Sequence, residues 1–204
     1  REFFNKSWFW KSITVRPVIK SKIRKKILYI RKKKNNKNIK FSFSKVFKEI
    51  KKIISKNKII GGYYPVNSEI DILEILESLE KKVGAKLSLP VIKKNNEMDF
   101  YKWSTKSLLK LNKFGIPEPE EIKKVFPDVI FVPIVAFDNR LYRIGYGGGY
   151  YDRYIQKLSN KKKLFKIGIA HSCQKINKVP INKYDKKLDI IITEKYILRW
   201  EFFF

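Results

Sequence analysis

A glycine-rich segment between Arg143 and Arg153 carries the strongest chemical signal in this chain. It reads Arg-Ile-Gly-Tyr-Gly-Gly-Gly-Tyr-Tyr-Asp-Arg and holds four of the nine glycines of the sequence. Glycine has no Cβ, so such a loop can adopt positive φ and present backbone N–H groups to a ligand. Successive N–H groups followed by a helix N-terminus form a binding site for anions such as phosphate. The flanking arginines add positive charge, and Asp152 offers an oxygen ligand suited to Mg²⁺.

The same glycines also admit a simpler interpretation, in which they only let the chain change direction. Their spacing matches neither of the two common nucleotide motifs. No Lys-Ser/Thr pair follows them, and Tyr150 stands where the dinucleotide fingerprint requires a third glycine. From the residues alone, phosphate binding and a plain turn both stay open. The density of glycine, arginine and acid in one segment is the argument for phosphate.

Few side chains elsewhere offer a nucleophile. His171 is the only histidine and Cys173 the only cysteine, and zinc-ligand spacing is absent. A lone histidine after a strand is more often a structural hydrogen-bonding group, and a lone cysteine is more often a buried thiol. Chemistry that depends on positioning and charge neutralisation, such as phosphoryl transfer, fits this inventory better. One cysteine excludes an intrachain disulfide, so we expect a reducing compartment, the cytoplasm.

The charge of the chain suggests a second class of function. Its 204 residues include 47 basic and 19 acidic side chains, for a formal net charge of +28. Such a charge favours polyanions, and a basic nucleic-acid-binding protein is one hypothesis. However, the lysines are spread along the whole chain, as a general compositional bias would also produce. Hydrophobic residues make up 44%, enough for a packed core, and no apolar run is long enough to span a bilayer.

The elements that must position these residues follow from the apolar periodicity. We expect helices over residues 21–32, 46–54, 69–82 and 150–158, and buried strands over 59–65, 86–92, 129–135, 164–170 and 188–193. Residues 100–114 are ambiguous, with Leu108, Leu109 and Leu111 suggesting a short helix. Alternating helices and strands predict an α/β fold, a Rossmann-like three-layer sandwich around a mainly parallel central sheet. Ligands bind beyond the carboxyl ends of such strands, where we expect the glycine segment.

Several other residues are candidates by position. Glu69 follows the strand at 59–65, where it either faces the glycine segment or only favours the dipole of the next helix. Asp185 precedes the last strand and is either a second metal ligand or a turn residue. Trp103, Tyr150 and Tyr151 have the shape to stack on a planar heterocycle or to fill the core.

Motifs along the chain occur in a recognisable order. They are Lys20-x-x-Ile-Arg24, Tyr64-Pro-x-x-x-Glu69, Leu89-Pro-Val91, Phe114-Gly-Ile-x-Glu118-Pro119, Val132-Pro-x-x-Ala-Phe-Asp138 and the glycine segment, followed by Gln174, Pro180, Asp185 and Ile192-Thr-Glu194. This set resembles the 5-formyltetrahydrofolate cyclo-ligase family, also called 5,10-methenyltetrahydrofolate synthetase. The resemblance runs from Lys20 to Glu194. It implies an ATP- and Mg²⁺-dependent cyclisation of 5-formyltetrahydrofolate to 5,10-methenyltetrahydrofolate, with release of ADP and phosphate.

The resemblance also implies roles for individual residues. ATP would be held by Lys20, Arg24, Arg143, Ile144, Gly145, Tyr146, Gly147, Gly148, Gly149, Tyr150 and Tyr151. The folate would be contacted by Tyr64, Glu69, Trp103, Tyr150 and Tyr151, and Mg²⁺ would be bound by Asp152 and Asp185. The implied partners are small molecules, with no specific nucleic acid, no membrane, and a monomer or weak homo-oligomer. A family member that binds folate without turnover is a further alternative.

The chain departs from the family pattern at a few positions. Leu141 stands where the family usually has glycine, which predicts a reshaped turn. Asn182 and Tyr184 replace the usual Glu and His near Asp185, which changes the surroundings of the second expected metal ligand. For the domain organisation we expect an N-terminal extension at 1–19, the cyclo-ligase domain at 20–196 and a C-terminal tail at 197–204.

Overall fold

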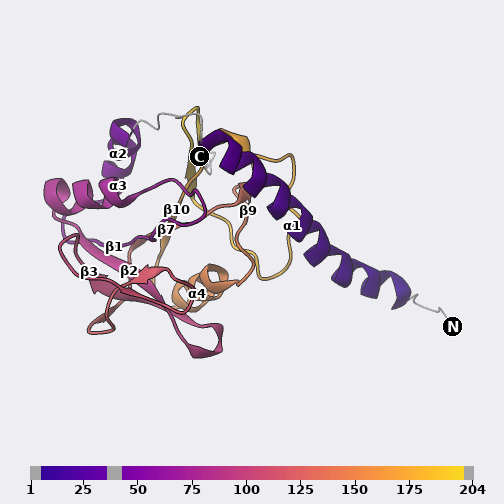
Figure 1. Ribbon diagram of the computed structural model, residues 1–204, viewed down its shortest axis with the longest axis horizontal. Coiled ribbons are helices and arrows are strands. Elements are labelled where there is room, and N and C mark those ends of the chain that lie inside the picture. The colour runs from indigo at the N-terminus through magenta and orange to yellow at the C-terminus, as the bar shows by residue number, and fades with distance from the viewer. Residues whose placement is uncertain (1–5, 36–42, 200–204) are drawn as a thin grey trace.

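The core of the molecule is an eight-stranded sheet, seen in a computed structural model that describes residues 6–35 and 43–199 (Figure 1). The strand order is β12-β11-β10-β7-β1-β2-β3-β6. The bounds are β1 (Ile59–Gly61), β2 (Lys86–Ile92), β3 (Met98–Trp103), β6 (Lys124–Val125), β7 (Val129–Val132), β10 (Phe165–Ile169), β11 (Ile190–Ile192) and β12 (Ile197–Arg199). Strands β11, β10, β7, β1 and β2 run parallel, and the remaining ones pair antiparallel. The predicted, mainly parallel sheet is confirmed.

Helices cover both faces of this sheet. They are α2 (Phe43–Lys51), α3 (Leu73–Ser78) with the π-helical turn η1 (Leu79–Val83), and α4 (Tyr150–Ser159). Residues of α2 and α3 share one apolar cluster with Phe131 of β7. Residues of α4 share another with Ile130 and Val132, which flank Phe131 in β7. Successive strand residues point to opposite faces, so β7 is buried on both sides, which explains its unbroken apolar sequence. The predicted three-layer sandwich is confirmed.

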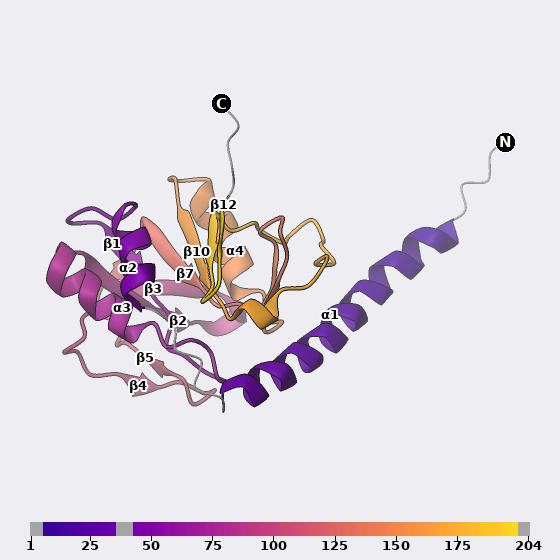
Figure 2. The same ribbon diagram turned by 90° about the horizontal axis from the view of Figure 1, so that it is seen from above.

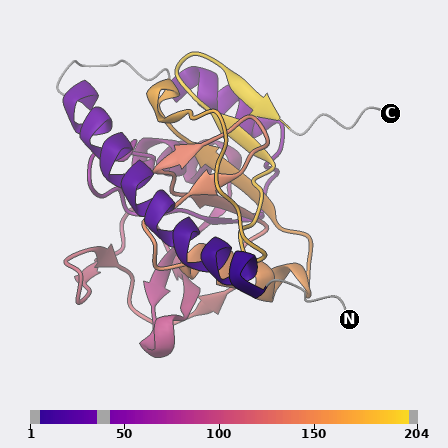
Figure 3. The ribbon, with the colours of Figure 1, turned by 90° about the vertical axis from the view of Figure 1, so that its right-hand side faces the viewer.

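A long helix, α1 (Lys6–Asn35), lies against the end of the sheet and extends away from the body toward the N-terminus (Figures 2 and 3). It packs through Ile27, which joins Val135, Ala136, Ile144 and Val179 in a third apolar cluster. The predicted helix at 21–32 is part of this longer one. The boundary expected between residues 19 and 20 falls inside the helix. In the segment expected as a C-terminal tail, Ile197–Arg199 forms β12.

Several local predictions were wrong. The helix expected from residue 69 begins only at Leu73, after Asp71 accepts a hydrogen bond from the Leu73 N–H at 2.8 Å. Residues 100–114 hold no helix: they complete β3 and reach β4 (Lys110–Leu111), which pairs with β5 (Pro117–Glu118). Leu108 is 90% exposed, so the leucine spacing there does not mark a buried face.

The glycine segment is likewise not joined directly to β7. A short hairpin of β8 (Ala136–Phe137) and β9 (Arg143–Ile144) lies between them, and β9 leads into the glycines. Two 3-10 turns, η2 (Lys94–Asn96) and η3 (Ser172–Gln174), complete the described elements. None of the described helices is long and apolar enough to cross a membrane.

The topology brings two loops together at one edge of the sheet. From β1 the chain crosses to its neighbour β2, whereas from β7 it crosses to β10 on the other side. Strands β1 and β7 are adjacent and parallel, so the direction of winding reverses between them. Loops diverge at such a reversal and leave a crevice at the carboxyl ends of the strands. The segment with Tyr64 and Glu69 follows β1, and the glycine segment follows β7 through its hairpin.

Candidate active site

The glycine segment has the backbone conformation that its sequence predicts. Gly147 has φ +112 and Gly149 has φ +67, values that a side chain would strain. Gly149 is the N-cap residue of α4 and has no side chain with which to cap that helix. The N–H groups of the first turn of α4 therefore lack intrahelical acceptors and point toward the end of the loop. The segment can thus present several donors to an anion, with the positive end of the helix dipole behind them.

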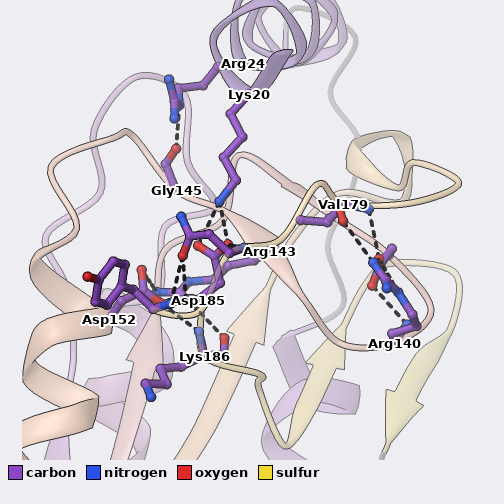
Figure 4. A network of polar contacts seen from close by, with 12 residues as sticks. Lys20, Arg24, Arg140, Arg143, Gly145, Asp152, Val179, Asp185 and Lys186 are labelled. Atoms are coloured by element: carbon purple, nitrogen blue, oxygen red, sulfur yellow. Dashed lines mark hydrogen bonds and ion pairs between the residues drawn. The ribbon is translucent and has the colours of Figure 1, made fainter. Parts of the chain in front are cut away.

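Helix α1 supplies cations to the same place (Figure 4). Lys20 Nζ bonds both carboxylate oxygens of Asp185, at 2.8 and 2.6 Å. One turn further on, Arg24 Nε donates to the Gly145 carbonyl at 2.7 Å. A Cβ at Gly147 would lie 3.5 Å from the Arg24 guanidinium carbon, so this arginine lies directly against the loop. The structure brings Lys20 and Arg24 to the glycine segment, as the resemblance implies.

The two acids expected as metal ligands lie close together. Arg143 donates to the two oxygens of Asp152 at 3.1 and 3.2 Å, and its own side chain is only 4% exposed. The Lys186 N–H, next to Asp185, also donates to Asp152, at 3.0 Å. Both carboxylates therefore face cations at the glycine end of the site. Asn182 supports this arrangement, because its side-chain oxygen accepts the Asp185 N–H and its own N–H donates to the Asp185 carboxylate.

This donor set fits Mg²⁺. Magnesium in proteins typically uses one or two carboxylates and completes its shell with phosphate oxygens and water. Asp152 and Asp185 provide the two carboxylates. The described residues contain no cluster of three or more His, Cys, Asp or Glu side chains, so nothing there indicates an all-protein metal cage.

Glu69 lies on the other side of the crevice, among tyrosines. Its Oε2 accepts the Val66 N–H at 2.9 Å. Its Oε1 is buried and has no hydrogen bond of ordinary geometry among the described residues, although the Tyr146 hydroxyl is near enough to favour the ionised carboxylate. Burial raises the pKa of Glu69, and the charge of Arg31 partly opposes that rise.

The Glu69 carboxylate also affects the pKa values of the tyrosine hydroxyls around it. Burial raises the pKa of Tyr63, Tyr146 and Tyr151, and the nearby Glu69 raises each further. The Tyr151 hydroxyl is buried and has no partner within the described part of the chain. Two buried polar atoms, Glu69 Oε1 and Tyr151 Oη, thus have unused hydrogen-bonding capacity. Such atoms cost free energy unless a ligand satisfies them.

The remaining expected substrate contacts divide into two groups. Tyr64 is half-buried in the loop after β1, and Tyr150 bonds Asn96 through its hydroxyl, at the turn between β2 and β3. Arg153 bonds the Asn96 and Gly148 carbonyls, so it ties that turn to the glycine segment. Trp103 lies apart: it pairs with Leu87 at the start of β2, toward the amino ends of the parallel strands. The structure does not bring Trp103 to the other candidates.

Two features were missed or misjudged from the sequence. Arg31 is buried and contacts Tyr146, yet in a helix with many basic residues nothing distinguished it. Leu141 adopts φ +67, the left-handed conformation that glycine favours, and is 1% exposed. The turn thus keeps a glycine-like backbone with leucine in place, and the side chain fills the second core cluster.

The hairpin around Leu141 is held by a buried acid. Asp138 is fully buried and accepts hydrogen bonds from the Arg140 side chain and from the N–H groups of Tyr142 and Val179. This network fixes β8 and β9, and through them the start of the glycine segment.

Comparison with known proteins matches this chain to one group. The model of the 5-formyltetrahydrofolate cyclo-ligase family covers residues 17–194. The 5-formyltetrahydrofolate cyclo-ligase of Escherichia coli K12 is 32% identical over 148 residues, which are 69% of this chain and 80% of that protein. An NMR structure of 5,10-methenyltetrahydrofolate synthetase from Aquifex aeolicus superposes with a TM-score of 0.69 at 32% identity, covering 89% of this chain and 92% of the other.

A second structure shares the fold. The 5,10-methenyltetrahydrofolate synthetase from Mycoplasma pneumoniae gives a TM-score of 0.64 at 24% identity, with 85% of this chain and 97% of that one covered. The motif order, the glycine loop between cationic α1 and two carboxylates, and the extent of these matches agree. The chain belongs to the 5-formyltetrahydrofolate cyclo-ligase family.

Proposed function

We propose that this protein converts 5-formyltetrahydrofolate and ATP to 5,10-methenyltetrahydrofolate, ADP and phosphate, with Mg²⁺. Membership of the family supports the folate substrate and the ligase class. The geometry supports a reaction in which positioning and charge neutralisation dominate, because the site offers cations, carboxylates and N–H donors. The candidate site contains neither histidine nor cysteine.

The phosphates of ATP are assigned to the glycine segment. Positive φ at Gly147 and Gly149, the uncapped start of α4 and the two side chains Lys20 and Arg24 together favour a polyphosphate. Lys20 bonds Asp185, and Arg143 bonds Asp152. These cations therefore already lie where the negative charge of a triphosphate needs neutralising.

Asp152 and Asp185 are the proposed ligands of Mg²⁺. When bound there with ATP, the ion would neutralise charge on the phosphate oxygens and help to orient them. Arg143 holds Asp152 in place from the buried side, and the Lys186 N–H fixes the same carboxylate. These contacts keep the Asp152 carboxylate oriented toward the loop.

One observation carries the folate assignment: Glu69 Oε1 and Tyr151 Oη are both buried without a partner in the described residues. A pterin ring presents amino and ring N–H donors together with carbonyl acceptors, and it can satisfy both atoms. Tyr64 and Tyr150 border the same crevice and supply aromatic surface. We assign these four residues to the folate and exclude Trp103, which lies toward the opposite edge of the sheet.

We place the protein in the cytoplasm, as a monomer or weak homo-oligomer acting on small molecules. Cys173 is the single cysteine of the chain and cannot form an intrachain disulfide, which is consistent with a reducing compartment. Nucleic-acid binding stays the rival hypothesis because of the charge of +28. That hypothesis predicts affinity for duplex DNA or RNA that falls steeply with salt.

A turnover assay tests the proposal. Purified protein with 5-formyltetrahydrofolate, ATP and Mg²⁺ should form the methenyl chromophore, and omission of ATP or chelation of Mg²⁺ should abolish the absorbance change. Binding of the folate is measured in parallel. No absorbance change with clear folate binding would identify an inactive, folate-binding member. Neither turnover nor folate binding, together with salt-sensitive binding to nucleic acid, would support the rival hypothesis.

A further inference from the structure

Arg31 is a buried cation that the family resemblance leaves without a role. Its side chain is 1% exposed, and among the described residues it forms no ion pair with a carboxylate. Its guanidinium donates to the Ile134 carbonyl at 3.1 Å, to the Asn67 carbonyl at 2.6 Å and to the Tyr146 hydroxyl. The remaining donor, Nε, has no partner in the described part of the chain.

Packing alone does not explain a guanidinium at this position. Burying a charge costs several kcal/mol unless it is well paired, and an apolar side chain of similar size would anchor α1 without that cost. Ile27, one turn earlier on the same face, anchors the helix in this apolar way. The charge and the several N–H donors of the Arg31 guanidinium must therefore be explained by the groups that they contact.

The three acceptors belong to three segments that surround the candidate site. Asn67 lies in the loop after β1, two residues before Glu69. Ile134 lies between β7 and β8, and Tyr146 lies in the glycine segment. Arg31 thus bonds both the proposed folate loop and the proposed ATP loop.

The loop before Glu69 needs such support. Asn67 and Ser68 have φ of +50 and +60, and two consecutive left-handed residues other than glycine are strained. Glu69 is held by this turn, since its N–H and its Oε2 both bond Val66. The bond from Arg31 to the Asn67 carbonyl fixes the turn from behind, and with it the direction of the Glu69 side chain.

We propose that Arg31 is a positioning residue for the folate end of the site, which holds the Asn67–Glu69 turn and the Tyr146 hydroxyl in the geometry that receives the substrate. The proposal rests on the function proposed above. Along about 16 Å of one face of α1, Lys20 then contacts the Asp185 carboxylate, Arg24 the glycine loop and Arg31 the folate loop.

The charge of Arg31 gives a specific readout. The groups facing Glu69 are the hydroxyls of Tyr63, Tyr146 and Tyr151 and the guanidinium of Arg31. Arg31 is the cation among them, and it lowers the pKa of Glu69 against the larger effect of burial. If the ionised Glu69 binds the folate, removing this charge moves the acidic limb of kcat/KM for the folate to higher pH.

Three variants make the test. Arg31→Met removes the charge and the forked guanidinium, Arg31→Lys keeps the charge, and Arg199→Met is the control, because Arg199 of β12 is paired with Glu49 of α2 and lies outside the candidate site. For Arg31→Met we expect about a tenfold rise in the folate KM, less than threefold in the ATP KM, and an acidic limb shifted to higher pH. For Arg31→Lys we expect a smaller rise in the folate KM and an unshifted limb. Arg199→Met should leave both KM values and the acidic limb unchanged.

Each outcome decides something. Equal rises in the KM for the folate and the KM for ATP would overturn the positioning role. So would an acidic limb of kcat/KM that does not shift in a folded Arg31→Met variant. If Arg31→Met does not fold, Arg31→Lys decides: an unchanged folate KM overturns the proposal. These failures leave wild-type turnover intact, so the proposed function survives them. A wild-type protein that neither turns over nor binds 5-formyltetrahydrofolate would overturn both proposals together.

Discussion

Replacing Asp152 with asparagine changes one oxygen to nitrogen at the centre of the candidate site. The carboxylate accepts hydrogen bonds from Arg143 at 3.1 and 3.2 Å and from the Lys186 N–H at 3.0 Å. The amide oxygen of asparagine can keep the contact with Lys186 and one with Arg143. The amide nitrogen cannot accept the other, and the negative charge that balances Arg143 and would bind Mg²⁺ is gone.

The cost in stability can be estimated. A hydrogen bond to a charged group contributes about 1.5–3 kcal/mol. The Asp152 side chain is 23% exposed, so water replaces part of what is lost. We expect Asp152→Asn to unfold about 1–2 kcal/mol more easily, a fall of roughly 2–8 °C in melting temperature for a chain of this size. The effect on catalysis should be larger: about a hundredfold loss in kcat/KM for ATP, equivalent to about 2.7 kcal/mol.

A matched control separates the two effects. Asp128 is 25% exposed and bonds a cation, Lys162, and a backbone N–H, that of Ile59, both at 2.8 Å. It precedes β7 and lies at the amino edge of the sheet, opposite the site. Asp128→Asn should therefore lose similar stability and keep its kinetics.

The assay is turnover over a range of Mg²⁺ concentrations, with thermal melts of both variants. Asp152→Asn should require at least about tenfold more Mg²⁺ for half-maximal rate, whereas Asp128→Asn should match the wild type. An unchanged Mg²⁺ requirement in a folded Asp152→Asn would refute the metal role. An equal shift in the Asp128 variant would show that loss of stability explains the effect.

Three further predictions concern other parts of the site. Lys20→Met should raise the KM for ATP about tenfold and leave the folate KM within about twofold; kinetics with each substrate varied in turn check this, and equal rises would contradict the assignment of Lys20 to ATP. Leu141→Gly and Leu141→Ala both lose the buried isopropyl group, and alanine keeps only Cβ, but φ at Leu141 is +67. We therefore expect Leu141→Gly to be more stable than Leu141→Ala by about 0.5–1 kcal/mol, although alanine is usually the more stable of the two. Urea unfolding in which Leu141→Ala is the more stable variant would show that the turn is not strained. Burial raises the pKa of Glu69, so its ionised form destabilises the fold at high pH. Glu69→Gln should melt at a higher temperature than the wild type at pH 8, and the gain should shrink as the pH falls through the folded-state pKa toward about 4.3. A gain independent of pH would exclude this origin.

The strands were predictable where their burial is complete. β7, β10 and β11 are covered on both faces, so their sequences are continuous apolar runs that few other structures tolerate. β3 was missed because it was sought inside a longer segment in which leucine spacing imitates a helix. Leu108 and Leu111 are largely exposed, so their spacing reflects no packing. Apolar periodicity indicates structure only where the residues that carry it are buried.

The site was predictable only in part, for a related reason. Glycines with positive φ leave a mark in the sequence because few other residues can replace them, and Gly147 and Gly149 have that conformation. Arg31 leaves no such mark, because arginine is as common on an exposed helix face as in a buried contact. Its three acceptors lie 36 to 115 residues away. Only the tertiary structure distinguishes it from its basic neighbours.

The attachment of α1 has a consequence for the order of folding. Its bonds to the rest of the site join residues far apart in sequence: 165 positions separate Lys20 from Asp185, and 121 separate Arg24 from Gly145. Contacts of such long range form slowly, because the entropy of closing a large loop is lost before they contribute. During synthesis, α1 emerges well before Asp185. The phosphate end of the site therefore cannot be assembled on a growing chain, and a ribosome-bound chain that ends before Asp185 should fold its sheet partly and remain without a complete site.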